Sequence, residues 1–193
     1  MLAKIPAPVA LPRRSFLFDS LNATLSVTAV AMLSGCAGLS NAAGRSDGQA
    51  ASDVRILSTA LAAEREAVAA YQLGADSGLL SPGVLKVAVG FQDHHKQHAD
   101  LLTTTIRKLG GEPQQPPARY DFPTQGLKRQ QDVLEFAAGL ERGAVSAYAG
   151  AVPLFAERDL AQAAASILAD EAMHWAVLRQ ALGLDPVPGA FFS

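Results

Sequence analysis

The stretch Ala63–Tyr71, AEREAVAAY, decides how this chain folds, because it returns almost unchanged as Leu140–Tyr148, LERGAVSAY. In both copies a glutamate, Glu64 or Glu141, precedes the tyrosine by seven positions. Such a separation is about two turns of an α-helix, so the glutamate and the tyrosine share one helix face. The repeat predicts two similar helices that occupy equivalent places in the two halves of one fold.

Each copy of the repeat is followed by a second helical segment that carries a close polar pair. The pair is His95 and His98 in the first half, and Glu171 and His174 in the second. Residues three positions apart lie on one helix face and can reach one ion. Two helix pairs, each with one carboxylate and one such ligand pair, predict an all-α four-helix bundle with a metal site between its halves.

The composition limits the class of protein. The chain has 193 residues, of which 49% are hydrophobic, enough for one domain with a sizeable core. Alanine supplies much of that apolar content, and it favours close-packed helices over strands. The formal net charge of -2 leaves no basic surface, so nucleic acid is excluded as an expected partner.

Capping signals set the expected helix boundaries. Ser52 or Asp53 can cap the first helix, Ser81-Pro82 suits the start of the second, and Gly110-Gly111 suits its end. The aromatic tail residues Phe191 and Phe192 are expected to dock on the bundle. The predicted helices cover about 53–76, 81–109, 127–152 and 157–182, within a bundle domain assigned to residues 53–193.

A proline-rich segment, Glu112–Gly126, separates the second and third predicted helices. No helix or central strand tolerates its four prolines, Pro113, Pro116, Pro117 and Pro123. The segment is long for a hairpin turn, but it suits a crossover between two helices that lie parallel. A long proline-rich crossover between helices two and three is therefore expected.

Residues 1–43 have the features of an export signal and are set aside from the fold. Arg13–Leu17, RRSFL, precedes an uncharged stretch from Leu21 to Ala37 that is too short and too polar for a membrane span. The arginine pair resembles a twin-arginine signal, and the alternative is the basic start of an ordinary secretory signal. Both interpretations predict a protein exported to the periplasmic side of a bacterial cell envelope.

The single cysteine lies where the apolar run ends, in Leu33-Ser34-Gly35-Cys36. This resembles the lipobox of bacterial lipoproteins, in which the cysteine carries the lipid, so Cys36 is expected to anchor the protein to a membrane. The alternative is cleavage after Ala42, with Cys36 as an incidental thiol. Residues 44–52 are small and polar and are interpreted as a flexible tether.

The repeat, the ligand pairs and the crossover together resemble the ferritin-like family, and especially its short exported bacterial members. In metal-binding members, helices one and three each give a Glu, while helices two and four each give Glu-x-x-His. The resemblance implies that Glu64 and Glu141 are the single carboxylates and that Glu171 and His174 form one pair. His98 matches the histidine of the other pair. His95 stands where the family has a glutamate, so three carboxylates and three imidazoles replace the usual four and two.

The resemblance implies a di-iron or mononuclear iron site, with manganese or zinc as alternatives. Iron favours carboxylates that can bridge two ions, and imidazoles complete each ion's shell. A histidine at position 95 removes one negative charge and one bridging group, which makes a single ion, or none, more plausible. Whether His94 or His95 faces inward is left open by the helical spacing. Asp93 and Asp100 are the expected partners that orient the imidazoles.

Two classes of function fit this sequence. The first is a metal-dependent redox protein that oxidises ferrous iron or consumes peroxide or oxygen, with Glu64, His95, His98, Glu141, Glu171 and His174 as ligands. The second is a non-catalytic scaffold or binding module of the cell envelope, because a fold alone does not define a function. Either protein can work as a homo-oligomer.

Overall fold

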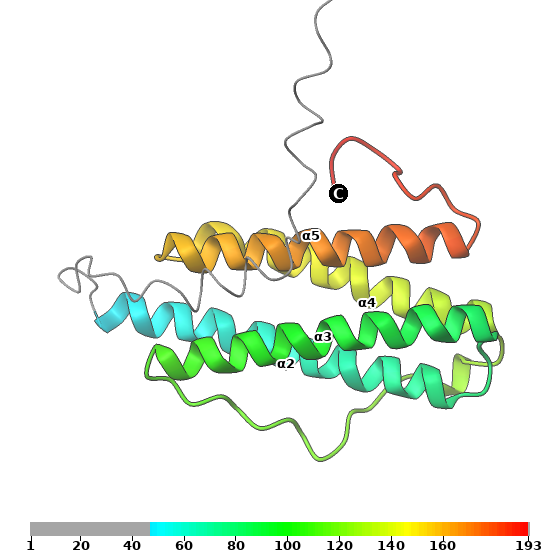
Figure 1. Cartoon of the computed structure of the whole chain (residues 1–193), viewed down its shortest axis with the longest axis horizontal. Helices are drawn as coiled ribbons and strands as arrows, with labels where there is room; N and C mark the ends of the chain where they lie inside the picture. Colours follow the sequence, from blue (N-terminus) through cyan, green and yellow to red (C-terminus); the bar gives the residue numbers. More distant parts are fainter. Residues whose placement is uncertain (1–46, 193) are drawn as a thin grey trace, which may run out of the picture.

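Four long helices lie side by side in the computed structural model, which describes residues 47–192 (Figure 1). Their bounds are Asp47–Asp76 for α2, Pro82–Lys108 for α3, Gln130–Ala151 for α4 and Arg158–Ala181 for α5. Two short 3-10 helices, η1 at Thr124–Gly126 and η2 at Val152–Leu154, flank α4. Within the described residues there is no β-strand, so the predicted all-α four-helix bundle is confirmed.

The helices form two hairpins joined by one long connection. α2 packs mainly against α3, and α4 packs mainly against α5. The connection at residues 109–129 returns along the whole length of the bundle, so α3 and α4 run in the same direction (Figure 1). The crossover between helices two and three is therefore confirmed, and the two hairpins begin at opposite ends of the bundle (Figure 1).

Glycines end two of the helices, and for α3 the sequence predicted this at Gly110-Gly111. Gly110 has φ 80° after α3, and the amide of Gly111 donates to the carbonyl of Ile106 at 2.9 Å. Gly183 has φ 74° after α5, and the amide of Leu184 donates to the carbonyl of Arg179 at 2.9 Å. Both arrangements are Schellman caps, which need a residue that tolerates the left-handed conformation.

The start of α2 differs from the prediction. α2 begins at Asp47, so residues 47–52, which were assigned to a flexible tether, are helical. The alanines there extend an existing helix at little cost, because elongation is far easier than nucleation. Asp53 is not a cap for its own helix. It is fully buried, and its Oδ1 accepts a hydrogen bond from the amide of Ala156 at 3.0 Å, just before α5 begins.

The start of α4 also differs, since the helix begins at Gln130 rather than near Leu127. The carboxylate of Asp132 accepts hydrogen bonds from the amides of Lys128 and Arg129, at 3.0 and 2.8 Å. These bonds make Arg129 the capping residue and keep the preceding residues outside the α-helix.

Apolar side chains fill the bundle on one side of its middle. One buried cluster combines Leu57 and Leu61 of α2 with Leu102 and Ile106 of α3 and Leu160 of α5. The connection after α3 packs closely on α2 there: a Cβ on Gly111 would lie only 2.7 Å from the Cγ1 of Val54. Charged side chains take over further along the bundle, where the candidate site begins.

The C-terminal tail docks only in part. The ring of Phe192 packs edge-on against Trp175 at a centroid distance of 5.5 Å, but Phe191 is 90% exposed. The predicted export signal and its lipid-anchor residue, Cys36, lie outside the described residues. From Asp47 to Phe192, none of the helices combines the length and apolar character that a membrane span requires.

Candidate metal centre

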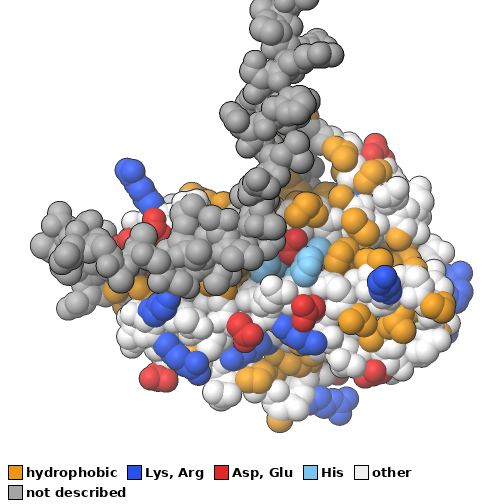
Figure 2. Space-filling view, in the orientation of Figure 1, with side chains coloured by type: hydrophobic (Ala, Val, Ile, Leu, Met, Phe, Trp, Pro, Cys, Tyr) orange, Lys and Arg blue, Asp and Glu red, His pale blue; other side chains and the backbone are white. Residues whose placement is uncertain are grey.

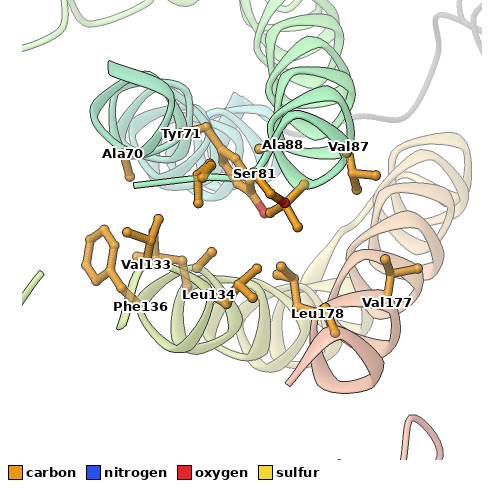
Figure 3. A pocket seen from close by; sticks show the side chains of 17 residues that line it. Ala70, Tyr71, Ser81, Val87, Ala88, Val133, Leu134, Phe136, Val177 and Leu178 are labelled. Carbon is orange, nitrogen blue, oxygen red and sulfur yellow. The ribbon is translucent and has the colours of Figure 1, made fainter. Parts of the chain in front are cut away.

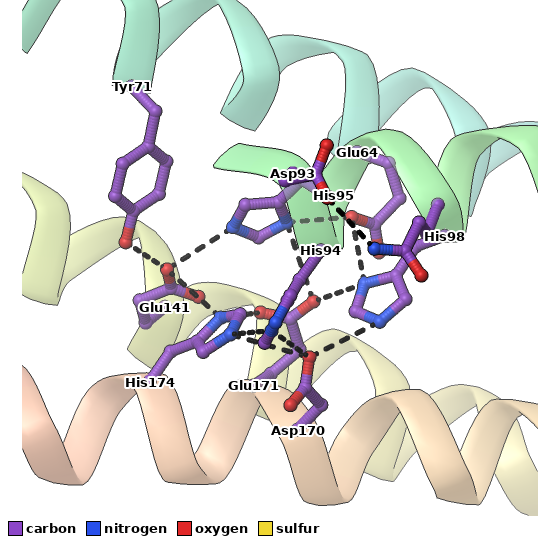
Figure 4. Close-up of polar contacts among 11 residues, drawn as sticks. Glu64, Tyr71, Asp93, His94, His95, His98, Glu141, Asp170, Glu171 and His174 are labelled. Carbon is purple, nitrogen blue, oxygen red and sulfur yellow. Dashed lines mark hydrogen bonds and ion pairs between the residues drawn. The ribbon is translucent and has the colours of Figure 1, made fainter. Parts of the chain in front are cut away.

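All six predicted ligands meet in the middle of the bundle, and every helix contributes at least one (Figure 4). Five of them are at most 3% exposed, and the side chain of His98 is 14% exposed. The repeat places the two single glutamates on α2 and α4, while α3 and α5 bring the paired ligands from the opposite side. The six residues are Glu64, His95, His98, Glu141, Glu171 and His174.

The ligand atoms fall into two overlapping groups, in each of which all atoms lie within 4.8 Å of one another. One group adds Glu64 and His98 to a shared pair, and the other adds Glu141 and His174 to the same pair. The shared residues are His95 and Glu171. They occupy the two positions from which a side chain can face both groups.

His95 lies between the two glutamates of the repeat. Its Nδ1 is 2.8 Å from Oε2 of Glu64, and its Nε2 is 3.2 Å from Oε1 of Glu141. The choice between His94 and His95 is thereby decided. His95 is 1% exposed and faces the centre, whereas the side chain of His94 is 45% exposed and lies at the rim.

The tyrosines of the repeat cross-link its two copies. The hydroxyl of Tyr148 donates to Oε1 of Glu64 at 2.6 Å, and the hydroxyl of Tyr71 donates to Oε1 of Glu141. Each tyrosine thus holds the glutamate of the other copy. Burial and the neighbouring glutamate raise the pKa of both phenols well above their usual value, so both remain donors. These bonds fix the orientation of each carboxylate and explain why Glu and Tyr recur together.

Buried polar atoms without partners provide a test of whether the cluster fits a metal. Among residues 47–192, Nδ1 of His98, Nδ1 of His174, Oε2 of Glu141 and both carboxylate oxygens of Glu171 are buried and form no hydrogen bond. Some of them lie near one another, as Nδ1 of His98 does to Oε1 of Glu171 at 3.1 Å, but not in hydrogen-bonding geometry. Imidazole nitrogens and carboxylate oxygens are the ligands that iron, manganese and zinc take, so the residues fit such an ion.

Protons balance the charge of the cluster when no ion is present. Burial alone would lower the pKa of the imidazoles, but the carboxylates that lie close to their nitrogens favour the charged form and outweigh it. They raise the pKa of His95 to about 10, of His98 to about 11 and of His174 to about 9. At neutral pH these imidazoles are therefore cations, and an ion that binds must displace their protons.

The carboxylates respond in opposite directions. Burial would raise the pKa of Glu64, but the hydrogen bond with His95 and the nearby imidazole of His98 outweigh it and lower the pKa to about 2. The pKa of Glu141 is also lowered, because its imidazole partners outweigh burial. The pKa of Glu171 is raised by burial and by the neighbouring carboxylates. A positive ion nearby would therefore lower the pKa of Glu171 and favour its charged form.

Asp170 is a further acidic residue beside the cluster that the sequence did not single out. Its Oδ2 is 3.4 Å from Nε2 of His98 and 3.3 Å from Nε2 of His174. It thus holds the outer nitrogens of both imidazoles, while their Nδ1 atoms face the centre. Asp93 and Asp100, the predicted orienting residues, are both exposed, and that expectation was wrong. The available signal was the spacing of Asp170 four residues before His174.

Two hollows adjoin the cluster. A groove of about 360 Å³ between α2 and α4 has alanine or glycine at nearly half of its lining positions, with Glu64, His95 and Glu141 also among its lining residues. An apolar cavity of about 330 Å³ is lined by side chains of all four helices, including Tyr71, Val87, Val133 and Val177 (Figure 3). Because Tyr71 also bonds to Glu141, this cavity lies one side chain away from the cluster.

Comparison with known proteins agrees with this architecture. A family model described as "Ferritin-like domain" matches residues 52–184. No curated protein matches the sequence. The family match covers all four helices almost completely and includes every residue of the cluster.

Several solved structures are similar to this chain. A conserved hypothetical protein from Mycobacterium tuberculosis has a TM-score of 0.64 and 25% identity, and the match covers 76% of this chain and 99% of that one. A ferritin-like diiron-carboxylate protein from Bacillus anthracis str. Ames has a TM-score of 0.61 and 21% identity, over 69% of this chain and 97% of that one. The bacterioferritin of Desulfovibrio desulfuricans, solved for its diiron site, has a TM-score of 0.66 and 18% identity, over 73% and 84%. At these identities the last two show the shared fold alone.

Proposed function

This chain belongs to the ferritin-like domain family, and we propose that it is an exported metal-binding member that holds iron in the buried cluster. The proposed activity is oxidation of ferrous iron, with peroxide or dioxygen as the oxidant. Manganese and zinc are alternative ions for the same ligands.

The observation that supports this proposal most strongly is the set of buried atoms without partners. Taking carboxylates and imidazoles out of water costs free energy, and a native interior normally satisfies such groups. Here five buried nitrogen and oxygen atoms from three different helices form no hydrogen bond within the described residues. Cations bound in the two ligand groups would supply the missing partners.

The residues of this chain have distinct roles in the proposed centre. One ion would be held by Glu64 and His98, a second by Glu141 and His174, and Glu171 would serve both. Asp170 keeps the two outer imidazole nitrogens protonated, so that the inner nitrogens are free to act as ligands. Iron held there would supply the electrons that reduce peroxide or dioxygen, one from each ferrous ion.

His95 makes the proposed centre unequal. A neutral imidazole has one acceptor nitrogen, so His95 can serve one ion as a neutral ligand but not both. A bridging glutamate in its place would serve both and would add a negative charge. The proposal is therefore one strongly held ion and one weaker ion in each chain, or a single ion only.

The proposed location is the periplasmic side of a bacterial cell envelope, with a lipid on Cys36 as the membrane anchor. The support comes from the sequence alone, in Arg13–Leu17 and in Leu33-Ser34-Gly35-Cys36. Mass spectrometry of the native N-terminus tests the anchor. A lipid mass on Cys36 is the expected result, and an unmodified chain that begins at Ala43 would contradict it.

A metal-free scaffold is the second candidate, favoured by the pairing of His95 with Glu64 and Glu141. Proton-filled imidazoles beside carboxylates form a charge-balanced interior that needs no ion, and buried charge pairs of this kind can be purely structural. This alternative predicts the same fold with no metal content.

Metal analysis separates the two candidates. The protein is purified without added metal, loaded with ferrous iron in the absence of oxygen, desalted and analysed for metal per chain. Between one and two iron ions per chain are expected, because two ligand groups share two residues. A metal content at background level, with an intact helical fold, would favour the scaffold. Glu135→Gln is the control for substitutions within the cluster, because Glu135 is exposed on the same helix as the buried Glu141.

A further inference from the structure

We propose that His94 and Asp170, at the rim of the cluster, form with His174 an outer binding position for a divalent cation on its way to the buried centre. This inference rests on the proposed function, because it concerns how the buried centre is filled. It adds a residue, His94, that the centre itself does not use.

The three side chains have the composition and the spacing of a cation site. Nδ1 of His94 is 3.1 Å from Oδ2 of Asp170 and 2.9 Å from Nε2 of His174. Their ligand atoms all lie within 4.8 Å of one another, and they come from two helices, α3 and α5 (Figure 4). Two imidazoles and one carboxylate suit divalent iron, manganese, cobalt or zinc.

Exposure decreases stepwise from this position to the centre. The side chain of His94 is 45% exposed and that of Asp170 is 23% exposed, whereas those of His174 and Glu171 are 2% and 0% exposed. Figure 2 shows histidine and acidic side chains together at the surface of this face, next to apolar ones. A hydrated ion can therefore reach His94 and Asp170 directly from solvent, whereas the side chain of Glu171 has no exposure to solvent.

The orientation of His174 links the outer position to the inner one. Its Nε2 faces Asp170 at 3.3 Å, while its Nδ1 lies 3.4 Å from Oε2 of Glu171. A neutral imidazole offers one lone pair, on one nitrogen or the other. His174 can thus hold an outer ion through Nε2 or an inner ion through Nδ1, but not both. The outer position is filled before the inner one and is released when the inner one is complete.

The groove between α2 and α4 lacks these features. Besides Glu66, its titratable lining residues are members of the buried cluster or the tyrosine bonded to it, and most of its other lining residues are alanine or glycine. It gives a small neutral molecule access to Glu64 and Glu141, but it presents no imidazole near the surface for a hydrated cation. The side with His94 is the one that can capture an ion.

The test follows the rate of metal uptake and its final extent separately. Cobalt(II), whose colour reports its ligands, is mixed rapidly with ion-free wild type and with the His94→Ala and Asp93→Ala variants, without oxygen. Asp93 is the matched control, because it is an exposed neighbour on the same helix and its loss removes a charge but no proposed ligand. Circular dichroism verifies that the helices are retained.

The expected result is that His94→Ala slows uptake by roughly tenfold and leaves the final cobalt per chain unchanged. Asp93→Ala should match wild type in both. Equal rates in all three proteins, with full final loading, would overturn the outer position and leave the proposed function standing. A final loading that falls with the rate would make His94 a ligand of the resting centre, which also contradicts the inference. Wild-type protein that takes up no cobalt would overturn both proposals.

Discussion

The hairpin of α2 and α3 and the hairpin of α4 and α5 are built on one plan and differ at one decisive position. Each contributes a glutamate and a tyrosine from its first helix, and the two tyrosines hold the glutamates reciprocally. The second helices then diverge, since α3 presents His95 where α5 presents Glu171. The parts that support the site are symmetric, but the parts that would bind ions are not.

This difference separates what the fold requires from what the chemistry requires. His95 is bonded to both Glu64 and Glu141, so it neutralises the interior without an ion. Both oxygens of Glu171 are buried and form no hydrogen bond within residues 47–192. At the equivalent positions, therefore, His95 has hydrogen-bonding partners inside the cluster, whereas Glu171 has both oxygens available to a cation.

The largest expected effect comes from removing the carboxylate that both ligand groups share. Glu171→Gln keeps the size of the side chain but removes its charge, so iron loading should fall to background. Glu135→Gln, exposed on α4, should retain wild-type loading. Iron per chain after anaerobic loading measures both. Undiminished iron in the Glu171→Gln variant would show that the asymmetry between the hairpins has no bearing on metal binding.

Restoring symmetry should have the opposite effect. His95→Glu gives α3 the same ligand pair as α5 and adds a bridging group and a negative charge. The second ion should then be held more tightly, so iron per chain should rise toward two. The comparison uses wild type and variant after identical anaerobic loading with ferrous iron. Two ions in wild type and fewer in the variant would show that His95 is itself a proper ligand for both groups.

The positions of these ligands were predictable because helical periodicity and an internal repeat constrain each other. Glu64 and Glu141 were identified from the repeat, and both are buried where the bundle requires. Asp170 was missed, because an aspartate on a helix usually faces solvent and only packing shows that it meets two imidazoles. The inward direction of His95 depended equally on packing, since the neighbouring His94 fits the same spacing.

Helix ends were predictable to different degrees for a similar reason. Gly110 and Gly183 end helices through a local backbone requirement that a sequence displays directly. The start of α2 at Asp47 was not predicted, because the residues before Asp53 are polar and small and show no periodicity. Asp53 looked like a cap for its own helix, but it accepts a hydrogen bond from Ala156 instead.

The ion-free protein should lose stability as the pH rises above neutrality. The folded pKa values of His95, His98 and His174, at about 10, 11 and 9, exceed the usual histidine value of 6.5. Their stabilisation is complete below pH 6.5 and is lost as the pH rises through those values. Thermal unfolding of ion-free protein from pH 6.5 to 10 measures this, with a falling Tm as the expected result.

Metal-loaded protein is the control for the pH series. An ion replaces the imidazole protons, so its binding strengthens as the pH rises and should offset the loss. If the ion-free protein kept a constant Tm over the same range, the imidazoles would not be paired with the carboxylates as described.

The smallest expected effects come from the symmetric part of the site. Tyr71→Phe and Tyr148→Phe each remove one hydroxyl that donates to a buried glutamate. Each should lower the free energy of unfolding by about 1–3 kcal/mol, and by similar amounts, because the two bonds are equivalent. Urea denaturation of the ion-free variants measures this. A large cost for one tyrosine and none for the other would break the proposed equivalence of the two repeats.

The most direct test of the central claim is anomalous diffraction at the iron absorption edge from crystals loaded with ferrous iron. The cluster should show a peak bounded by Glu171, Glu141 and His174, or by Glu171, Glu64 and His98, with the side chains of that group turned toward it. Absence of any peak from loaded crystals, with His95 still paired to Glu64 and Glu141, would contradict the account and identify the cluster as a structural network.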